Sequence, residues 1–238
     1  MSIFEKWGLE SSILDAIKSR GWIEPTEIQL DSIPLARKGK DIVGQAKTGS
    51  GKTAAFGIPI LERCQNKGFP QSIILCPTRE LAVQVTEELE LLQGKKGLKI
   101  VSVYGGTDIE KQAKVLSNGC DIVVGTPGRV IDMAKKGHLK LEKISIFCLD
   151  EADRMLDMGF FPDILWVIEK MPNRNQNLLF SATFPDEVLN ITEEIMTNAL
   201  TQAKEARLHI LSEMNKTIKK SRKEVNENAP KIIQMKIS

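Results

Sequence analysis

Several features are scarce or missing in this chain of 238 residues, and each absence excludes a class of protein. No apolar run approaches the roughly 20 residues that a membrane-spanning helix needs. Residues 1–10 contain acids and a glycine where a secretory signal would have an apolar segment. We therefore expect a cytoplasmic protein without contact to a membrane.

Residues that bind metal ions or form disulfides are also few. The four cysteines have no CxxC spacing, and three of them lie in or beside apolar, β-branched segments where a free thiol packs as a small apolar side chain. His138 and His209 have no partners at the spacing of a metal site or an activated nucleophile. These patterns predict a reducing compartment and no zinc site.

The charge is nearly balanced but unevenly distributed. The net charge is +2, yet residues 199–238 contain 9 Lys and Arg against 4 Asp and Glu, which leaves 24 against 27 in residues 1–198. The field of this larger part would repel a phosphate backbone. If it binds nucleic acid, a local and preorganised site has to do so.

Short apolar segments alternate with longer amphipathic segments. Buried strands are predicted at 41–43, 72–76, 99–104, 121–125, 145–149 and 177–180. Helices are predicted at 10–20, 26–36, 53–65, 79–93 and 108–117. This alternation indicates an α/β fold with a parallel sheet and helices on both faces, in which ligands bind beyond the carboxyl ends of the strands.

The last part of the chain has a different pattern. Apolar residues at three- to four-residue spacing over 186–220 predict a C-terminal helical extension, followed by a polar segment at 219–229 and a strand-like end at 231–237. We expect one domain over 1–198 and a helical and basic tail over 199–238. The basic cluster at 219–223 is typical of a solvated linker, with RNA contact or nuclear import as alternatives.

A phosphate-binding loop is indicated between the first predicted strand and the helix after it. Its residues are Ala46, Lys47, Thr48, Gly49, Ser50, Gly51, Lys52 and Thr53. The glycines would let backbone N–H groups approach phosphates, Lys52 would reach the β- and γ-phosphates, and the Thr53 hydroxyl would bind Mg²⁺. Alanine replaces the usual first glycine, and a plain glycine-rich turn is the alternative.

An acidic segment follows the fifth predicted strand. Asp150 would hold the hydrated metal ion and Glu151 would position or deprotonate the attacking water, so both are expected to be catalytic together with Lys52. The alternative is an acidic loop that caps the next helix, because Asp and Glu are common in first turns. The presence of a phosphate-binding loop elsewhere in the chain favours the catalytic interpretation.

Asp150, Glu151, Ala152 and Asp153 together form the signature of DEAD-box RNA helicases. Residues 4 to about 186 resemble the first RecA-like domain of that family, with its motifs in the same order. The resemblance implies a RecA-like P-loop fold, ATP and Mg²⁺ as cofactors, and ATP hydrolysis coupled to RNA remodelling.

The segment 21–29 resembles the adenine-reading motif of the same family. An amide such as Gln29 would pair with the edge of adenine and the Phe4 ring would cover its face, which implies a preference for ATP over GTP. Trp22 stands where the family often has Phe or Tyr. Judged alone, Gln29 would be a helix-surface residue and Phe4 a core residue.

Three further segments resemble RNA-contacting loops of the family, and each follows a predicted strand. They comprise Pro77, Thr78 and Arg79, then Gly105 and Gly106, then Thr126, Pro127, Gly128 and Arg129. Hydroxyls, backbone N–H groups and arginines suit phosphate and sugar contacts, so we expect binding that ignores RNA sequence. The alternative is that the threonines cap helices and the arginines pair with nearby acids.

Ser181, Ala182 and Thr183 resemble the motif that couples nucleotide and RNA binding, with hydroxyls that would bond toward Asp150 and Asp153. In this family a second RecA-like domain follows and completes the γ-phosphate site with arginines, and we expect this chain to act without it. Such arginines accelerate phosphoryl transfer by about 10³ to 10⁵. We therefore expect nucleotide binding, very weak hydrolysis and no unwinding.

From about residue 191 the chain is instead similar to a polynucleotide phosphorylase, over a long helix and the lead into its RNA-binding domain. The join would lie between about residues 186 and 198, and no catalytic residue follows from this likeness. It raises an alternative function, a non-catalytic nucleotide- or RNA-binding module that docks a protein partner, such as a phosphorylase, through its helical tail.

Overall fold

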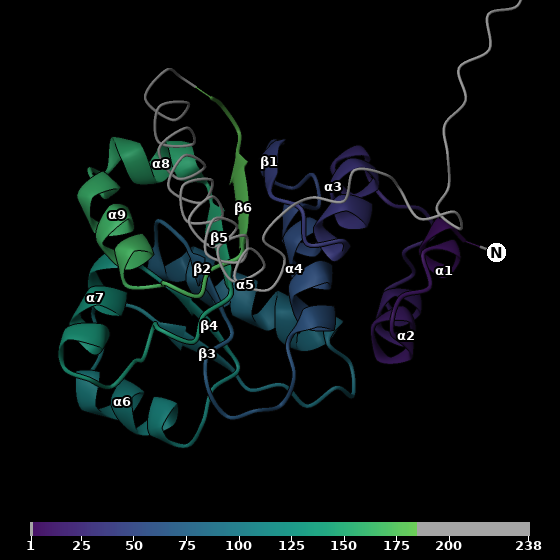
Figure 1. Cartoon of the computed structure of the whole chain (residues 1–238). Helices are drawn as coiled ribbons and strands as arrows, with labels where there is room; N and C mark the ends of the chain where they lie inside the picture. Colours follow the sequence, from purple (N-terminus) through teal and green to yellow (C-terminus); the bar gives the residue numbers. More distant parts are fainter. Residues whose placement is uncertain (1, 185–238) are drawn as a thin grey trace, which may run out of the picture. The chain divides into compact units, whose positions relative to one another are not determined.

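Six parallel strands form the centre of residues 2–184, the part of the chain that the computed structural model describes (Figure 1). The strand order is β1-β6-β5-β2-β4-β3. The bounds are Ile42–Gln45 (β1), Ser72–Leu75 (β2), Ile100–Val103 (β3), Ile122–Gly125 (β4), Ile146–Asp150 (β5) and Gln176–Ser181 (β6). The predicted strands and their parallel arrangement are confirmed.

Helices precede the sheet and occupy the connections between its strands. They are α1 (Ile3–Lys6), α2 (Ser11–Ser19), α3 (Glu27–Arg37), α4 (Lys52–Arg63), α5 (Arg79–Leu92), α6 (Ile109–Ser117), α7 (Pro127–Lys135), α8 (Ala152–Asp157) and α9 (Phe161–Glu169). The five predicted helices correspond to α2–α6. The short α1 and α8 and the two nine-residue helices α7 and α9 were not predicted from the sequence.

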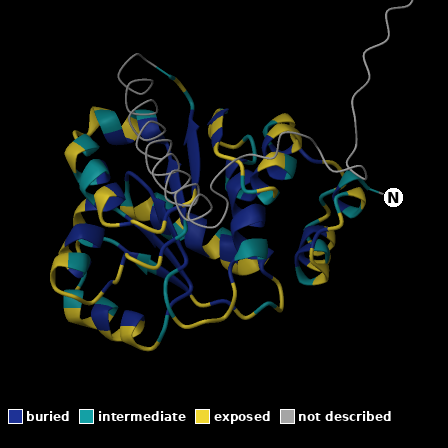
Figure 2. Cartoon of the chain, viewed as in Figure 1, coloured by how far each residue is buried: buried dark blue, intermediate teal, exposed yellow. Residues whose placement is uncertain are grey.

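Each face of the sheet has its own hydrophobic core, because successive side chains of a strand point to opposite faces. Leu178 and Phe180 of β6 pack in the core that contains residues of α2–α5, whereas Leu179 packs in the core formed with α6–α9. Figure 2 shows the buried strands between helices whose outer surfaces are exposed. The prediction of helices on both faces is therefore confirmed.

The strand order brings together chain segments that are far apart in sequence. β1, β6 and β5 are neighbours, with Gln45 opposite Ser181 and Asp150 opposite Phe180. β2, β4 and β3 form the other half of the sheet. The carboxyl edge of the first half therefore carries the loop at 46–53 and the acidic segment, and that of the second half carries the three arginine- and glycine-containing loops.

Several predictions concern residues beyond the described range. The helix expected at 186–220, the basic segment, the likeness to polynucleotide phosphorylase and the domain boundary at 198 all lie outside residues 2–184. Within residues 2–184, no helix has the length and apolar character needed to cross a membrane.

Candidate functional site

The loop at 46–53 connects β1 to α4 and has the backbone geometry expected of a phosphate-binding loop. Gly49 and Gly51 have φ angles of +82° and +89°, in the left-handed region that favours glycine. Gly51 is the N-cap of α4. Because glycine has no side chain, the N-cap residue makes no hydrogen bond to the first N–H groups of the helix. These N–H groups and the positive end of the helix dipole are thus available to an anion.

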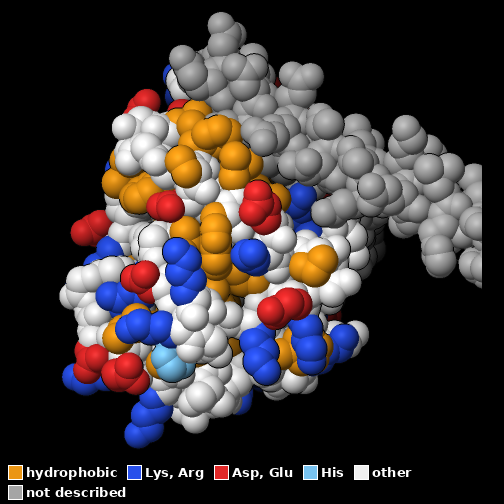
Figure 3. Space-filling model, turned by 60° about the vertical axis from the view of Figure 1, so that its left-hand side comes forward, with side chains coloured by type: hydrophobic (Ala, Val, Ile, Leu, Met, Phe, Trp, Pro, Cys, Tyr) orange, Lys and Arg blue, Asp and Glu red, His pale blue; other side chains and the backbone are white. Residues whose placement is uncertain are grey.

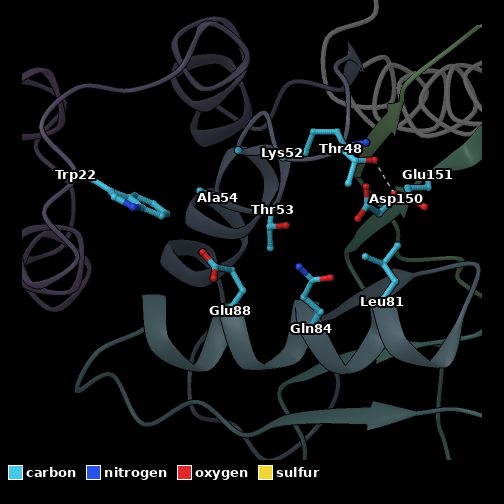
Figure 4. Close-up of a pocket in the computed structure, with 12 residues that line it drawn as sticks. Trp22, Thr48, Lys52, Thr53, Ala54, Leu81, Gln84, Glu88, Asp150 and Glu151 are labelled. Atoms are coloured by element: carbon cyan, nitrogen blue, oxygen red, sulfur yellow. Dashed lines mark hydrogen bonds between the residues drawn. The ribbon is translucent and has the colours of Figure 1, made fainter.

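A cavity of about 230 Å³ lies beside this helix start. Its walls are formed by Trp22, Thr48, Gly49, Gly51, Lys52, Thr53, Ala54, Leu81, Gln84, Glu88, Asp150 and Glu151. Figure 4 shows Trp22 at one end of this cavity and the two acids at the other. The expected convergence of the loop around Gly51 with Asp150 and Glu151 is confirmed.

Lys52 and Asp150 each have a buried polar atom without a partner. The two residues are only 6% and 3% exposed, and neither Lys52 Nζ nor Asp150 Oδ1 has a hydrogen-bond partner within residues 2–184. Leaving such a group unpaired costs about 1–3 kcal/mol. A buried ammonium beside an open helix start, with a carboxylate in the same cavity, fits a phosphate group and its divalent cation.

The environment of Asp150 raises its affinity for a proton. Burial raises the pKa of Asp150 to about 6, with Lys52 acting in the opposite direction and Glu151 adding to the rise. A metal ion at Asp150 would therefore compete with a proton only as the pH falls toward about 6. Because the Thr53 side chain lines the same cavity, Thr53 and Asp150 are the residues that could hold Mg²⁺.

Glu151 has a fixed orientation in the cavity wall. Its φ of 55° places it in the left-handed region, which is rare for a residue with a side chain. Thr48 Oγ1 donates to one carboxylate oxygen at 3.2 Å (dashed in Figure 4), and Arg154 Nη1 donates to the other at 2.5 Å. Glu151 is the N-cap of α8 but makes no side-chain cap bond, so the capping alternative is wrong for this residue.

The expectation for Phe4 is wrong. Phe4 is 1% exposed and its ring packs edge-on against Trp7, with 5.4 Å between the ring centroids. A ring without an exposed face cannot stack on a bound base; Phe4, which belongs to α1, is instead buried in the core that contains residues of α2–α5. Trp22 is the aromatic residue that lines the cavity.

Gln29 also has a different environment from the expected one. It is 4% exposed, its Oε1 accepts from the Thr26 N–H at 3.1 Å, and its Nε2 donates to the Gly51 carbonyl at 3.1 Å. A Cβ at position 51 would lie 2.4 Å from Gln29 Nε2, so this close approach also requires glycine. Gln29 therefore joins the segment 21–29 to the phosphate-binding loop and presents no free amide to the cavity.

Three residues of the loop belong to a different cavity. Ala46, Lys47 and Ser50 line a second cavity of about 550 Å³, together with Thr26, Glu27, Ile28, Asp31, Gln45 and Ala182. None of these three residues lines the cavity that contains Lys52 and Asp150. The loop therefore divides the predicted nucleotide-binding residues between its two sides.

Asp153 connects α8 to the end of β6. The Thr183 N–H and hydroxyl both donate to Asp153 Oδ2, at 2.9 and 2.8 Å, and the Asp153 N–H donates to Ser181 Oγ at 3.1 Å. These bonds outweigh the effect of partial burial and lower the pKa of Asp153. The expected contact of Ser181 and Thr183 is confirmed for Asp153 but not for Asp150, whose Oδ1 has no partner within residues 2–184.

The three predicted RNA loops lie on neighbouring strands, after β2, β4 and β3. Gly105, Gly106 and Gly128 are exposed, whereas Pro77 and Pro127 are buried and offer no surface to a ligand. Lys and Arg side chains on the face that Figure 3 shows are interspersed with Asp and Glu, so this face has no extended basic patch.

The alternative readings of these loops are only partly correct. Thr78 caps α5 by accepting from the Leu81 N–H at 3.3 Å, but Thr126 makes no side-chain cap bond. Arg79 lies over the Tyr104 ring, with Cζ 4.9 Å from the centroid. Within residues 2–184 neither Arg79 nor Arg129 has an acidic partner, so both retain uncompensated positive charge.

Gln112 joins two of the loops, and sequence analysis did not identify it. Its Nε2 donates to the Tyr104 carbonyl at 3.1 Å and to Thr107 Oγ1 at 2.8 Å, and its Oε1 accepts from Arg129 Nη1 at 3.1 Å. Arg129 Nη2 also donates to the Thr107 carbonyl at 3.0 Å. The Gln112 amide and the direct bond from Arg129 to Thr107 together set the position of the glycine loop relative to Arg129.

Gln84 and Glu88 of α5 were also missed. They lie four residues apart, which places them on one face of the helix, and both line the first cavity. The sequence shows that Gln84 and Glu88 follow the Pro77–Arg79 segment at helical spacing. It does not show that their face of α5 is turned toward Trp22.

Comparisons with known proteins agree with this geometry. The sequence model of the family described as DEAD/DEAH box helicase matches residues 26–191. The DEAD-box ATP-dependent RNA helicase CshA of Streptococcus pneumoniae is 50% identical over 194 residues, which are 81% of this chain and 37% of the relative. CshA of Geobacillus kaustophilus is 46% identical over 197 residues, 82% of this chain and 42% of the relative.

Solved structures with the same fold include relatives from archaea. A DEAD box protein from the hyperthermophile Methanococcus jannaschii has a TM-score of 0.75 and 47% identity, and the match covers 79% of this chain and 52% of that one. A hypothetical ATP-dependent RNA helicase from Sulfolobus tokodaii has a TM-score of 0.74 and 41% identity, over 80% and 56% of the two chains.

The matched regions define both the family and the extent of the likeness. The chain spans 37% and 42% of the length of the two curated relatives, so it corresponds to a part of each. The predicted RecA-like fold is confirmed by the two solved structures. With the family model matching most of the described residues, the chain belongs to the DEAD/DEAH box helicase family.

Proposed function

We propose that this chain binds Mg²⁺-ATP and RNA as the nucleotide-binding part of an ATP-dependent RNA helicase. The observation that carries the proposal is the pair of buried atoms without partners, Lys52 Nζ and Asp150 Oδ1, beside the open start of α4. A cation, a carboxylate and free backbone N–H groups in one cavity have the chemistry that a triphosphate and its metal ion require.

The residues at the acidic end of the cavity divide the chemistry between them. Lys52 and the N–H groups around Gly51 would bind the phosphates, while Thr53 and Asp150 would hold Mg²⁺, which supplies charge neutralisation at the transferred phosphoryl group. Glu151 would orient the attacking water and accept its proton. The hydrogen bonds from Thr48 and Arg154 hold the Glu151 carboxylate in place at the edge of the cavity.

At the other end we propose that Trp22 stacks on the base. The ring lines the cavity and is half-buried, and aromatic side chains stack on nucleobases of any type. A preference for ATP over GTP would require Gln29 to release the Gly51 carbonyl and turn its amide toward the base. This preference is therefore a separate element of the proposal, with its own measurement.

RNA binding is proposed for the loops after β2, β3 and β4. Arg79 and Arg129 have positive charge without an acidic partner within residues 2–184, and the exposed glycines allow close approach of a phosphate backbone. These groups contact phosphate and sugar, so affinity should depend strongly on salt and little on RNA sequence.

Hydrolysis by this chain alone should be very slow. None of the residues that line the first cavity is an arginine, so the described part of the chain offers no guanidinium to the γ-phosphate. Arginines of this kind contribute about 10³ to 10⁵ in rate. Membership of a helicase family favours this proposal over a non-catalytic docking module, and a protein partner for the tail stays a prediction.

Calorimetric titration with ATP and GTP, each with and without Mg²⁺, tests the proposal. We expect Mg²⁺ to strengthen ATP binding, which would support Asp150 and Thr53 as its ligands, and we expect GTP to bind more weakly. Equal ATP affinities with and without Mg²⁺ would remove the metal site from the proposal. Equal affinity for ATP and GTP would remove only the adenine preference.

A further inference from the structure

Arg20 connects two walls of the first cavity at the end occupied by Trp22. Its guanidinium lies over the Trp22 ring, with Cζ 4.9 Å from the ring centroid. The same guanidinium bonds to both carboxylate oxygens of Glu88, with Nη2 and Oε2 2.7 Å apart and Nη1 bonded to Oε1. Arg20 is the C-cap residue of α2, and Glu88 belongs to α5.

The cavity lies on one side of this arrangement. Trp22 and Glu88 both line it, whereas Arg20 does not. Figure 4 shows the Trp22 ring and the Glu88 carboxylate directed toward the same space. Arg20 therefore supports the ring from outside the cavity and leaves the cavity side open to a ligand.

The Trp22 side chain packs partly against the core that contains residues of α2–α5, while its chain neighbours are exposed. Gly21, Ile23 and Glu24 are all exposed, and Ile23 is 77% exposed. The Trp22 N–H bonds to the Ile17 carbonyl at 3.2 Å, which fixes the backbone at that point but not the ring. The orientation of the ring therefore depends on its core contact and on the guanidinium over its face, which Glu88 holds in place.

We propose that Arg20 and Glu88 are positioning residues for base recognition, which hold the Trp22 ring in the orientation that stacks on a bound nucleobase. The inference rests on the proposed nucleotide site. A planar guanidinium can bond to a carboxylate with two parallel bonds and cover an aromatic face at the same time, and a lysine cannot do both. The two side chains are each 24% exposed, and their paired bonds hold the guanidinium in one geometry over the ring.

The main variant is the double substitution Arg20→Ala, Glu88→Gln. It removes one positive and one negative charge, so the net charge near the cavity stays the same and long-range attraction of phosphates is unaffected. We expect ATP affinity to fall about threefold to tenfold, the range of a cation–π contact together with partial loss of base stacking. GTP affinity should fall by a similar factor, because stacking on Trp22 does not discriminate between purines.

The affinity for inorganic tripolyphosphate distinguishes a lost base contact from a general structural defect, because only a general defect would lower it. Tripolyphosphate occupies the phosphate end without a base, so the double variant should bind it as wild type does. A matched control is Lys18→Ala, Glu5→Gln, which removes another ion pair of α2, with 2.8 Å between Lys18 Nζ and Glu5 Oε1, away from the cavity lining. This control should leave both affinities unchanged.

A Trp22→Ala background identifies the route of the effect. If Arg20 and Glu88 act through Trp22, the double substitution should have no further effect on ATP affinity once Trp22 is absent. A persisting loss in that background, or an equal loss of tripolyphosphate affinity, would overturn the inference. Wild-type protein that binds neither ATP nor tripolyphosphate would overturn the proposed nucleotide site itself, whereas tight tripolyphosphate binding without any gain from the base would overturn the inference alone.

Discussion

The Thr48 hydroxyl donates a hydrogen bond of 3.2 Å to the Glu151 carboxylate, although 103 positions separate the two residues. The bond forms because β1 and β5 end on the same edge of the sheet with only β6 between them. It joins the phosphate-binding loop to the acid that would handle the attacking water. A nucleotide entering the cavity therefore meets both groups already in contact.

Removal of Lys52 should abolish nucleotide binding. In Lys52→Ala the buried ammonium that would meet the β- and γ-phosphates is lost, and we expect ATP affinity to fall by at least about 100-fold, because buried charge-assisted contacts are strong. Titration calorimetry measures this directly. Glu151→Gln is the matched comparison: it should bind ATP as wild type does, and equal affinity in wild type and Lys52→Ala would contradict the mechanism.

Asp150 should make the nucleotide-free protein less stable as the pH rises. Its pKa is raised in the folded state, from 3.8 to about 6, so the stabilisation is complete below pH 3.8 and is lost as the pH rises through about 6. Two pKa units correspond to about 3 kcal/mol. Urea unfolding between pH 4 and 7.5 should show this loss in wild type and not in Asp150→Asn; parallel pH profiles would contradict the assignment.

The two glycines of the loop should differ in their tolerance of alanine. Gly49→Ala introduces a Cβ at positive φ into open space, which costs about 1–2 kcal/mol. Gly51→Ala adds to that strain a Cβ 2.4 Å from Gln29 Nε2. We expect thermal unfolding to show the larger loss for Gly51→Ala, together with loss of ATP binding. Equal losses would show that Gln29 adjusts to the added atom.

Gln112 should matter for RNA affinity through Arg129. Gln112→Leu removes one of the two acceptors that orient the guanidinium and leaves the Thr107 carbonyl, so we expect the dependence of RNA affinity on salt to weaken by up to one phosphate contact, a change in slope of at most about 0.7 for single strands. Fluorescence anisotropy with a short single-stranded RNA at several salt concentrations measures the slope.

Two comparisons complete this RNA experiment. Gln65→Leu makes the same exchange at an exposed position away from the loops and should leave the slope unchanged. Arg129→Ala should reduce the slope at least as much as Gln112→Leu does, and the two substitutions together should have no larger effect than Arg129→Ala. Additive losses would mean that Gln112 acts without Arg129.

Local sequence patterns were sufficient for the elements and for the phosphate-binding loop. Apolar segments such as 72–76 and 121–125 predict buried strands because a parallel sheet covered on both faces needs apolar residues at every position. Gly49 and Gly51 predict a turn that lets backbone N–H groups approach phosphates, and the structure gives both a positive φ, which few other residues adopt at low cost. The short α1 and α8 were missed because one or two turns give too little periodicity to detect.

The sequence by itself determined the strand and helix order, the loop at 46–53 and the acids at 150 and 151, because each depends on neighbouring residues. Only the tertiary structure decided that Phe4 is buried while Trp22 lines the cavity, that Gln29 bonds to Gly51, and that Ala46, Lys47 and Ser50 line a second cavity. These outcomes depend on which surfaces meet when the helices pack on the sheet, and packing is a property of the whole core that no local pattern contains.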